Sequence, residues 1–526
     1  MSHIELLHIE GFKKFQRFDI PLNPHMNILV GENEAGKSTI LEAIRIVFNQ
    51  QYRTADKSIL ADLFNTQNIN AFRESPCVKT LPEIVIEAHL ALDSGEKNSS
   101  YFHGEVYGDR TQQIEKYGIR FECKYDRELG SGMEAFINEG NLPLDYYSLS
   151  WMTFANRPYK TIKRPFHFLF IDTDASATGP SFNYYNKSLF ANKYDAATQA
   201  KAKNEFRAKL DIAFDSVGLD PINEHRKFGI DGKKVLLENI ISVYEDSVPL
   251  ENRGRGMENL IKTQIALDRA NRLDVILMEE PENHLCFSSL QKMIHEISGN
   301  QDDSQIIITT HSNMIACNLN LNNVFWITEG KARSLKDVSK DVAEFFLRAD
   351  NNAFLQLLLS EKVFLVEGAT EFILLPKFYE QQIGRTIELD GISVIPCGGI
   401  SYKRYLEIAE KTNKKVSVIT DNDGSEEKIA EARIYNQAHE LQQVFMADDI
   451  GTWTWEVCLY QENKQALNNL IPTQANAKYL FHGNDYGAVL GKMLNNKADV
   501  AYQILMSKAV YSIPKYIQDA IKWLSE

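Results

Sequence analysis

A glycine-rich stretch near the N-terminus carries residues that could bind a nucleotide. Residues 31–39 read Gly-Glu-Asn-Glu-Ala-Gly-Lys-Ser-Thr and fit the pattern GxxxxGK[ST]. The backbone N–H groups of such a loop can cradle phosphates, while Lys37 reaches the β- and γ-phosphates and Ser38 coordinates Mg²⁺. The stretch therefore predicts an ATP site with contacts from Asn33, Gly36, Lys37, Ser38 and Thr39.

Two later segments add carboxylates and a histidine to this predicted site. The apolar run 274–278 ends in Glu279 and Glu280, and the β-branched run 306–310 ends in His311. We assign Glu279 to the Mg²⁺ shell and Glu280 to the attacking water, as base or water-positioning residue. An imidazole at His311 can hydrogen-bond the γ-phosphate or the water. The three segments together predict ATP hydrolysis.

A second set of acids lies in the C-terminal third of the chain. Glu367 and Glu371 are four residues apart where an apolar strand turns into a helix, and Asp421 and Asp423 flank one residue after another strand. Carboxylates that converge repel one another unless cations lie between them. Because the ligands are oxygens only, the pattern favours Mg²⁺ or Mn²⁺ over zinc. Any one of these acidic turns is also compatible with a solvated loop.

The elements that must position these residues indicate an α/β fold. Residues 26–30 form a short buried-strand pattern that runs into the glycine-rich loop, and residues 39–48 have helical spacing. Residues 273–311 read as strand, helix and strand. Between them lie strand-like runs over 83–170 and a helical stretch over 190–247. We interpret residues 175–250 as an inserted helical dimerisation segment, without the heptads of a long coiled-coil arm.

A second α/β series follows a helical connector over residues 332–358. Its predicted strands are 362–367, 392–396, 415–420 and 443–446. The predicted domains are therefore residues 1–355, for the nucleotide, and 356–526, for the metal.

Composition limits the classes of function. The 526 residues are 44% hydrophobic and 24% charged, which predicts a folded, multi-domain protein. The formal net charge of −14 means that any nucleic-acid site must be local. One candidate is the basic stretch Arg157, Lys160, Lys163 and Arg164, although the pattern favours a solvated face over contact with DNA.

Cysteine spacing and hydropathy suggest a compartment. The six cysteines form no CxxC pair, so they read as free thiols. No run approaches the roughly 18 to 20 apolar residues of a membrane helix. We expect a soluble, cytoplasmic protein with no membrane contact.

The segments EEPENHL (279–285) and TTHS (309–312) resemble the Walker B, D-loop and switch-histidine elements of ABC-type ATPases, particularly the RecF and OLD (overcoming lysogenization defect) branch. This resemblance implies that two copies sandwich ATP, each offering a glycine-rich signature to its partner. The candidate signature is 253–259, with Gly256 as the nucleotide contact and Arg255 where the family usually has serine. A homodimer or higher even oligomer is implied.

The C-terminal strands, 363–371 and 416–424, resemble the Toprim pattern of topoisomerases, primases and OLD nucleases: a glutamate before glycine, then DxD. The resemblance implies phosphodiester cleavage with metal bound by Glu367, Asp421 and Asp423, and with Glu371 as a ligand of a second metal or as the base. Glu456 is a further metal ligand or a helix-capping acid. Lys497 neutralises the scissile phosphate or is a surface lysine.

As a whole the chain resembles an OLD-family nuclease, which implies an ATP-binding and ATP-hydrolysing, divalent-metal-dependent DNA endonuclease of bacterial antiphage defence. Such nucleases work with a UvrD-like helicase in Gabija-type systems, or with a retron reverse transcriptase and its RNA–DNA product. The alternative is a RecF-like DNA-binding ATPase of DNA repair with a non-catalytic Toprim module, but a retired site should have lost ligands. Topoisomerase or primase chemistry would require a tyrosine-bearing cleavage domain or a zinc-binding element, and the sequence has no zinc-ligand spacing.

Overall fold

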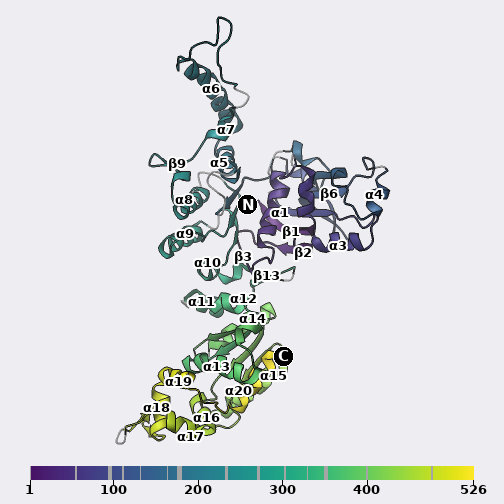
Figure 1. The fold of residues 1–526 in the computed structure, drawn as a ribbon. Helices are drawn as coiled ribbons and strands as arrows, with labels where there is room; N and C mark the ends of the chain where they lie inside the picture. The colour runs from purple at the N-terminus through teal and green to yellow at the C-terminus, as the bar shows by residue number, and fades with distance from the viewer. Residues whose placement is uncertain are drawn as a thin grey trace. The chain divides into compact units, whose positions relative to one another are not determined.

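The structure is a computed structural model that describes residues 2–53, 56–92, 98–108, 112–130, 132–162, 164–173, 180–231, 235–268, 273–300, 304–328, 330–348, 353–398, 401–474 and 478–526. The chain divides into two compact units (Figure 1). The first unit contains Met1–Leu319 and Asn323–Ala332, and the second contains Asn320–Asn322 and Arg333–Glu526.

The central sheet of the first unit has the strand order β14-β13-β3-β12-β11-β8. Its strands are β3 (Met26–Gly31), β8 (Phe168–Asp172), β11 (Val275–Glu279), β12 (Gln305–Thr309), β13 (Val324–Thr328) and β14 (Lys331–Ser334). The strands from β13 to β8 are parallel to their neighbours. The carboxyl ends of β3, β11 and β12, which carry the predicted nucleotide residues, therefore lie along one edge.

An antiparallel sheet forms the other layer of the first unit. Its order is β2-β1-β4-β6-β5, and β7 also pairs with β6. The strands are β1 (His3–Phe12), β2 (Phe15–Pro21), β4 (Ile84–Ala91), β5 (His103–Gly108), β6 (Gln112–Tyr125) and β7 (Tyr147–Thr153). The strand-like runs predicted between residues 83 and 170 thus mostly extend the sheet of β1, while β8 joins the central sheet.

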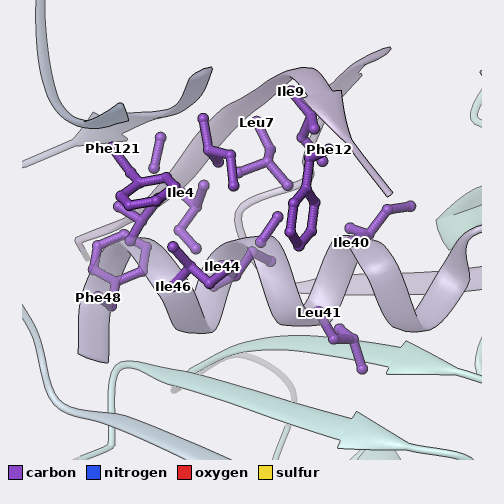
Figure 2. Close-up of a cluster of buried hydrophobic side chains, with 14 of the residues drawn as sticks. Ile4, Leu7, Ile9, Phe12, Ile40, Leu41, Ile44, Ile46, Phe48 and Phe121 are labelled. Atoms are coloured by element: carbon purple, nitrogen blue, oxygen red, sulfur yellow. The ribbon is translucent and has the colours of Figure 1, made fainter. Parts of the chain in front are cut away.

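Helix α1 (Lys37–Asn49) packs between these two sheets, with contacts to β4 and β6 of one and β3 and β11 of the other. Seven of its apolar side chains are buried, on more than one face: Ile40, Leu41, Ala43, Ile44, Ile46, Val47 and Phe48. A helix that is apolar around most of its surface needs such cover. Figure 2 shows Ile40 and Ile44 facing Leu7 and Phe12 of β1. The phosphate-binding loop is thereby anchored on a rigid core.

The remaining helices of the first unit include an inserted group. This group contains α5 (Pro180–Lys193), α6 (Ala196–Asp215) and α7 (Leu237–Ile240), followed by the short strands β9 (Tyr244–Glu245) and β10 (Val248–Pro249). The helix predicted over 196–214 is confirmed as α6, and none of its residues is buried. The other helices are α2 (Leu60–Leu63), α3 (Thr66–Glu74), α4 (Glu134–Asn138), α8 (Arg255–Leu267), α9 (Phe287–Gly299) and α10 (Asn313–Asn318).

The second unit is built on a parallel sheet with the order β16-β15-β17-β18. Its strands are β15 (Lys362–Val366), β16 (Ile392–Pro396), β17 (Lys415–Ile419) and β18 (Gln442–Phe445), close to the four predicted strands. Because β15 and β17 are neighbours, the residues that follow them meet at one sheet edge. Helices α11 (Lys340–Arg348) and α12 (Ala353–Leu359) of the predicted connector belong to this unit and contact α14, which spans Tyr402–Thr412.

The helices of the second unit otherwise follow the strands in sequence: α13 (Ala369–Ile383), α14 (Tyr402–Thr412), α15 (Glu426–Ala438), α16 (Trp455–Glu462), α17 (Lys464–Leu470), α18 (Ala488–Asn495), α19 (Lys497–Met506) and α20 (Lys515–Ser525). A short hairpin of β19 (Leu480–Phe481) and β20 (Asn484–Asp485) precedes α18. Among the described helices of both units, none is long and apolar enough to cross a bilayer.

Candidate functional site

The glycine-rich loop is held in a shape that fits phosphate binding. Strand β3 ends at the buried Gly31, and α1 starts at Lys37. Gly36 has φ of 101°, and a Cβ there would lie 2.4 Å from the ring of Phe15, so both backbone and space require glycine. The Lys37 ammonium donates to the carbonyl oxygens of Gly31 and Glu32, each at 2.9 Å. The lysine is therefore already folded over the loop.

The predicted carboxylates stand beside this loop. The Ser38 hydroxyl hydrogen-bonds the carboxylate of Glu279. Burial and the nearby carboxylates Asp172 and Glu280 raise the pKa of Glu279. Burial lowers the pKa of Lys37, although Glu280 and other acids oppose that change. A bound Mg²⁺ would relieve the crowding of negative charge, which supports the pairing of Ser38 with Glu279 as metal-shell residues.

Glu280 and His311 are brought together from adjacent strands. A Glu280 carboxylate oxygen lies 3.3 Å from His311 Nε2. Asn283 donates to the other Glu280 oxygen at 3.1 Å. Burial and the charge of Lys37 lower the pKa of His311, while Glu280 acts in the opposite direction. A carboxylate held between an amide and a neutral imidazole is well placed to orient water.

Sequence reasoning missed the role of Glu282. One of its carboxylate oxygens accepts from the Thr310 hydroxyl at 2.5 Å and from the backbone N–H of His311 at 2.8 Å. These bonds fix the loop that carries the histidine. The only sequence signal was a third acid two residues after Glu280, which by itself does not distinguish a positioning carboxylate from a solvated one.

A cavity of about 360 Å³ brings the predicted nucleotide residues together. Its lining includes Asn33, Gly36, Lys37, Ser38, Thr39, Glu280 and His311. Lys13, Lys14 and Glu34 also line it and were not predicted. Lys13 is paired with Glu42 of α1, and the exposed Lys14 lies 3.8 Å from a carboxylate oxygen of Glu34. A polyphosphate in this cavity would meet up to three lysines.

Gly256 lies outside this lining. It sits at the start of α8, and a Cβ there would lie 2.3 Å from the carbonyl oxygen of His284. Close packing of α8 on the loop after β11 is thus one reason for glycine at this position. Its predicted contact with a partner's nucleotide remains a prediction. Arg255, beside it, is exposed.

In the second unit, the ends of β15 and β17 bring Glu367 and Asp421 together. One oxygen of Glu367 accepts from the Thr420 hydroxyl at 3.0 Å and from the backbone N–H of Asp421 at 3.2 Å. Asp421 accepts from the N–H of Trp455 at 2.8 Å. Glu371, in the first turn of α13, accepts from the N–H of Gly368 at 3.0 Å. These hydrogen bonds aim several carboxylates at one sheet edge.

Two of these carboxyl groups have strongly raised pKa values. Burial and the charges of Glu367, Glu371 and Glu456 raise the pKa of Asp421 to about 8. Burial, with a contribution from Glu456, raises the pKa of Glu371 to about 7. Lys497 opposes both shifts. Negative charge therefore accumulates at this edge beyond what the side chains balance.

Glu456 and Lys497 join the same cluster. Glu456 is 2% exposed, and its oxygens accept from the hydroxyls of Thr370 and Thr454, each at 2.8 Å. The Lys497 ammonium lies 3.2 Å from Glu456. Glu456 lies in the first turn of α16, which Thr454 caps. Glu456 is turned inward because three polar groups hold it there.

Asp423 has a different environment from Asp421. It is exposed, has φ of 50° and forms an ion pair with Lys428. Its predicted role as a metal ligand would require the carboxylate to leave that lysine.

Within the described residues, no three acidic, histidine or cysteine side chains are already grouped at metal-binding geometry. The carboxylates accept hydrogen bonds from neighbouring hydroxyl and backbone N–H groups. The residues nevertheless fit a divalent cation, because the donors are all oxygens. Burial and, after it, repulsion between neighbouring carboxylates raise the pKa values of Asp421 and Glu371, and a cation would offset that repulsion.

Two family models match different parts of the chain. Residues 3–103 and 171–316 match the AAA ATPase domain family. Residues 358–423 match the Toprim domain of overcoming-lysogenization-defect-like proteins. These domains use a nucleotide and a divalent metal.

Curated relatives cover different shares of the chain. The DNA replication and repair protein RecF of Limosilactobacillus reuteri (strain DSM 20016) is 30% identical over 100 residues, 19% of this chain and 25% of the relative. The chain thus spans about a quarter of the length of that relative. Endonuclease GajA of Bacillus cereus (strain VD045) is 20% identical over 440 residues, 79% of this chain and 74% of the relative.

Solved structures show partial likeness. An SMC head bound to the C-terminal winged-helix domain of ScpA is 14% identical, with a TM-score of 0.34, over 64% of this chain and all of that one. RecF with ATP is 11% identical, with a TM-score of 0.34, over 64% of this chain and 99% of that one.

Proposed function

We propose that the chain is an ATP-binding and ATP-hydrolysing, divalent-metal-dependent DNA endonuclease. The proposal is based on its domain composition, which is that of an OLD-family nuclease: an AAA-type ATPase domain with an OLD-like Toprim domain. The GajA similarity, which spans most of both chains, supports cleavage over the shorter RecF match.

The observation that carries the proposal is the crowding of carboxylates at the edge of β15 and β17. Glu367, Asp421 and Glu456 would hold Mg²⁺ or Mn²⁺, and Asp423 would join them after leaving Lys428. Such ions supply an activated water and stabilise the leaving oxygen. Glu371, with a pKa of about 7, serves a second metal or takes the proton of the water.

Lys497 adds a positive charge to this site of carboxylates. Its ammonium faces the carboxylates from the start of α19 and is 44% exposed, so it can also reach a phosphate in solvent. Burial lowers its pKa, but Glu456, Asp421 and Glu371 together raise it above the usual value. A lysine that stays protonated can stabilise the extra charge of a pentacoordinate phosphorus transition state.

The nucleotide site would bind ATP with Mg²⁺ on Ser38 and Glu279. Lys37 contacts the β- and γ-phosphates, and Glu280 and His311 position the water. Because each copy has one such site, closing it by a sandwich needs a second copy with Gly256 at the γ-phosphate.

Exposed apolar side chains support a homodimer. In and after α6, Ile212 is 71% exposed, Ile222 58%, Phe228 60% and Tyr244 63%. A helix with no buried residue gains little stability from its own chain. We propose that residues 180–250 form the dimer contact together with the ATP sandwich.

Cleavage of supercoiled and linear DNA tests the nuclease proposal. The intact chain is expected to cut with Mg²⁺ or Mn²⁺, and Glu367→Ala and Asp421→Ala should each remove that activity. Glu427→Ala, an exposed acid of the same unit, is the matched control and should cut normally. Cutting that survives both site substitutions would reject the proposal. Binding without any cutting would favour the RecF-like reading.

We extend the proposal to bacterial antiphage defence. The resemblance names a UvrD-like helicase or a retron reverse transcriptase with its RNA–DNA product as partner. Plating of phages on cells that express the chain with each partner tests this role, and protection should disappear with Glu367→Ala. Protection that persists in that variant would separate defence from cleavage.

A further inference from the structure

A second cavity lies in the first unit, at the other edge of the central sheet. It has a volume of about 580 Å³ and is formed by the residues before β8 and β11, the segment 98–102 and helix α5. Strands β8 and β11 have five residues each, so this cavity is separated from the nucleotide site at their carboxyl ends by roughly 16 Å of strand. It is a distinct site.

The walls of this cavity combine apolar and hydrogen-bonding groups. Phe102 and Phe166 provide a buried apolar side. Asn98, Ser99 and Asn192 provide amides and a hydroxyl. An apolar side next to amides and a hydroxyl suits an aromatic heterocycle with polar edges, the chemistry of a nucleobase.

The pair His167 and Asp274 occupies one end of the cavity. Asp274 accepts from the backbone N–H of His167 at 2.6 Å and lies 3.1 Å from its Nδ1. The carboxylate charge is thus taken up by hydrogen bonds to His167. Asp274 therefore repels an anion in the cavity less than an aspartate without these hydrogen bonds would.

One cation of the basic stretch lines the cavity, and two others lie close to it along the chain. Arg164 lines it, and Arg157 stacks on Tyr101 with its guanidinium 4.6 Å from the ring centroid. The stretch is tied to the cavity wall by Tyr159, whose ring centroid is 6.2 Å from that of Phe102. Lys160 follows in the same turn. Lys163 lies outside the described residues.

These cations are exposed and unpaired. Arg157, Lys160 and Arg164 are all exposed, and within the described part of the chain none of them forms an ion pair with a carboxylate. By contrast, Arg120 in the same unit is paired with Glu87 at 2.5 Å. In a chain with a net charge of −14, an unpaired basic group marks a local anion-binding surface.

We propose that Arg157, Lys160, Arg164 and the adjoining cavity form a binding site for single-stranded nucleic acid on the ATPase unit. The three cations contact successive phosphates, and one unstacked base enters the cavity against Phe102 and Phe166. A paired base could not enter, so the site selects a single strand over a duplex. The inference deepens the proposed function, because it gives the nuclease a second contact with its substrate.

Binding without metal tests the site independently of cleavage. Anisotropy of a fluorescein-labelled single-stranded DNA oligonucleotide is measured in EDTA with the full chain, over a range of salt. Arg157→Ala, Lys160→Ala and Arg164→Ala combined should weaken binding on the order of 10- to 100-fold at about 0.1 M salt and flatten the log–log salt slope by about two units, at roughly 0.7 for each phosphate contact. Equal removal of the exposed Arg73, Lys79 and Arg127 is the matched control and should change neither quantity.

A cavity-filling variant tests the base pocket. Ala191 lines the cavity from the exposed side of α5, so Ala191→Trp fills the space and leaves every charge in place. It should weaken single-strand binding several-fold without changing the salt slope, and duplex binding should not change. Unchanged single-strand binding by both variants overturns the proposal. The binding assay contains no metal and therefore does not depend on cleavage. If the variants lose single-strand binding as expected but the intact chain cuts no DNA in the cleavage assay, only the nuclease proposal is rejected.

Discussion

The nucleotide site and the Toprim site of this chain differ in the sign of the charge that they present to a ligand. At the nucleotide site, a buried lysine is already hydrogen-bonded over the loop, and Glu280 and Glu282 each have their own partners. At the Toprim site, carboxylates crowd around a half-exposed Lys497, and two of their pKa values are raised to about 7 and 8. The first site presents the Lys37 ammonium to an anionic ligand, whereas the second presents several carboxylates to cations.

The fold can position the ligand-binding groups in advance at the nucleotide site to a greater extent than at the Toprim site. A polyphosphate is recognised by backbone N–H groups and a lysine that the fold can fix in advance. Carboxylates that are buried close together repel one another until a cation lies between them. The ligands of the second site are expected to move on metal binding, while those of the first are not.

The largest expected effect separates the two sites. Lys37→Ala removes the ammonium at the β- and γ-phosphates and should lower ATP hydrolysis by on the order of 10²-fold or more. Phosphate release measures this, and titration calorimetry with Mn²⁺ in the absence of nucleotide should show unchanged binding at the Toprim site. Parallel loss of Mn²⁺ binding would mean that the two sites are not independent.

The next effect tests preorganisation at the nucleotide site. Glu282→Ala removes the acceptor that fixes Thr310 and His311, so kcat for ATP hydrolysis should fall by roughly tenfold with little change in KM. Glu282→Gln keeps an oxygen acceptor and should retain most of the activity. Equal loss in both variants would assign Glu282 a role that needs its charge.

A smaller effect concerns stability at the Toprim site. Asp421 has a pKa raised to about 8, so the folded state binds a proton more tightly than the unfolded state does. The cost of ionising it is absent below the unfolded pKa of about 4 and grows until the pH passes about 8. Asp421→Asn should therefore raise the melting temperature of the metal-free second unit by a few degrees at about pH 8, and by less at about pH 5.

Scanning calorimetry with and without Mn²⁺ checks this prediction. The metal should stabilise the intact chain more than Asp421→Asn, because only the former keeps the carboxylate. The prediction is contradicted if, in the absence of metal, Asp421→Asn is less stable than the intact chain at both pH values. Ionisation of Asp421 would then not be what destabilises the site.

The smallest effect concerns Asp423. Lys428→Ala frees this carboxylate from an exposed ion pair, which is worth about 0.2–1 kcal/mol, and should tighten Mn²⁺ binding by about two- to threefold. Lys403→Ala, which breaks an exposed pair with Glu431 in the same unit, is the control. Unchanged affinity would indicate that Asp423 stays outside the metal shell.

The sequence by itself determined the elements whose chemistry is local. The glycine pattern before Lys37, the apolar strands that end in Glu279 and Glu367, and the helix over 196–214 all depend on near neighbours in the chain, and each lies where it was predicted. Short-range periodicity and turn chemistry are sufficient for such elements.

Only the tertiary structure decided which side chains meet. It joined the strands between residues 83 and 125 to the sheet of β1, turned Glu456 inward from α16, gave Glu282 its two donors and separated the environments of Asp421 and Asp423. These outcomes depend on strand order and on burial among residues far apart in sequence. No local pattern encodes them, because the free energy of a charged side chain is set by the groups around it in space.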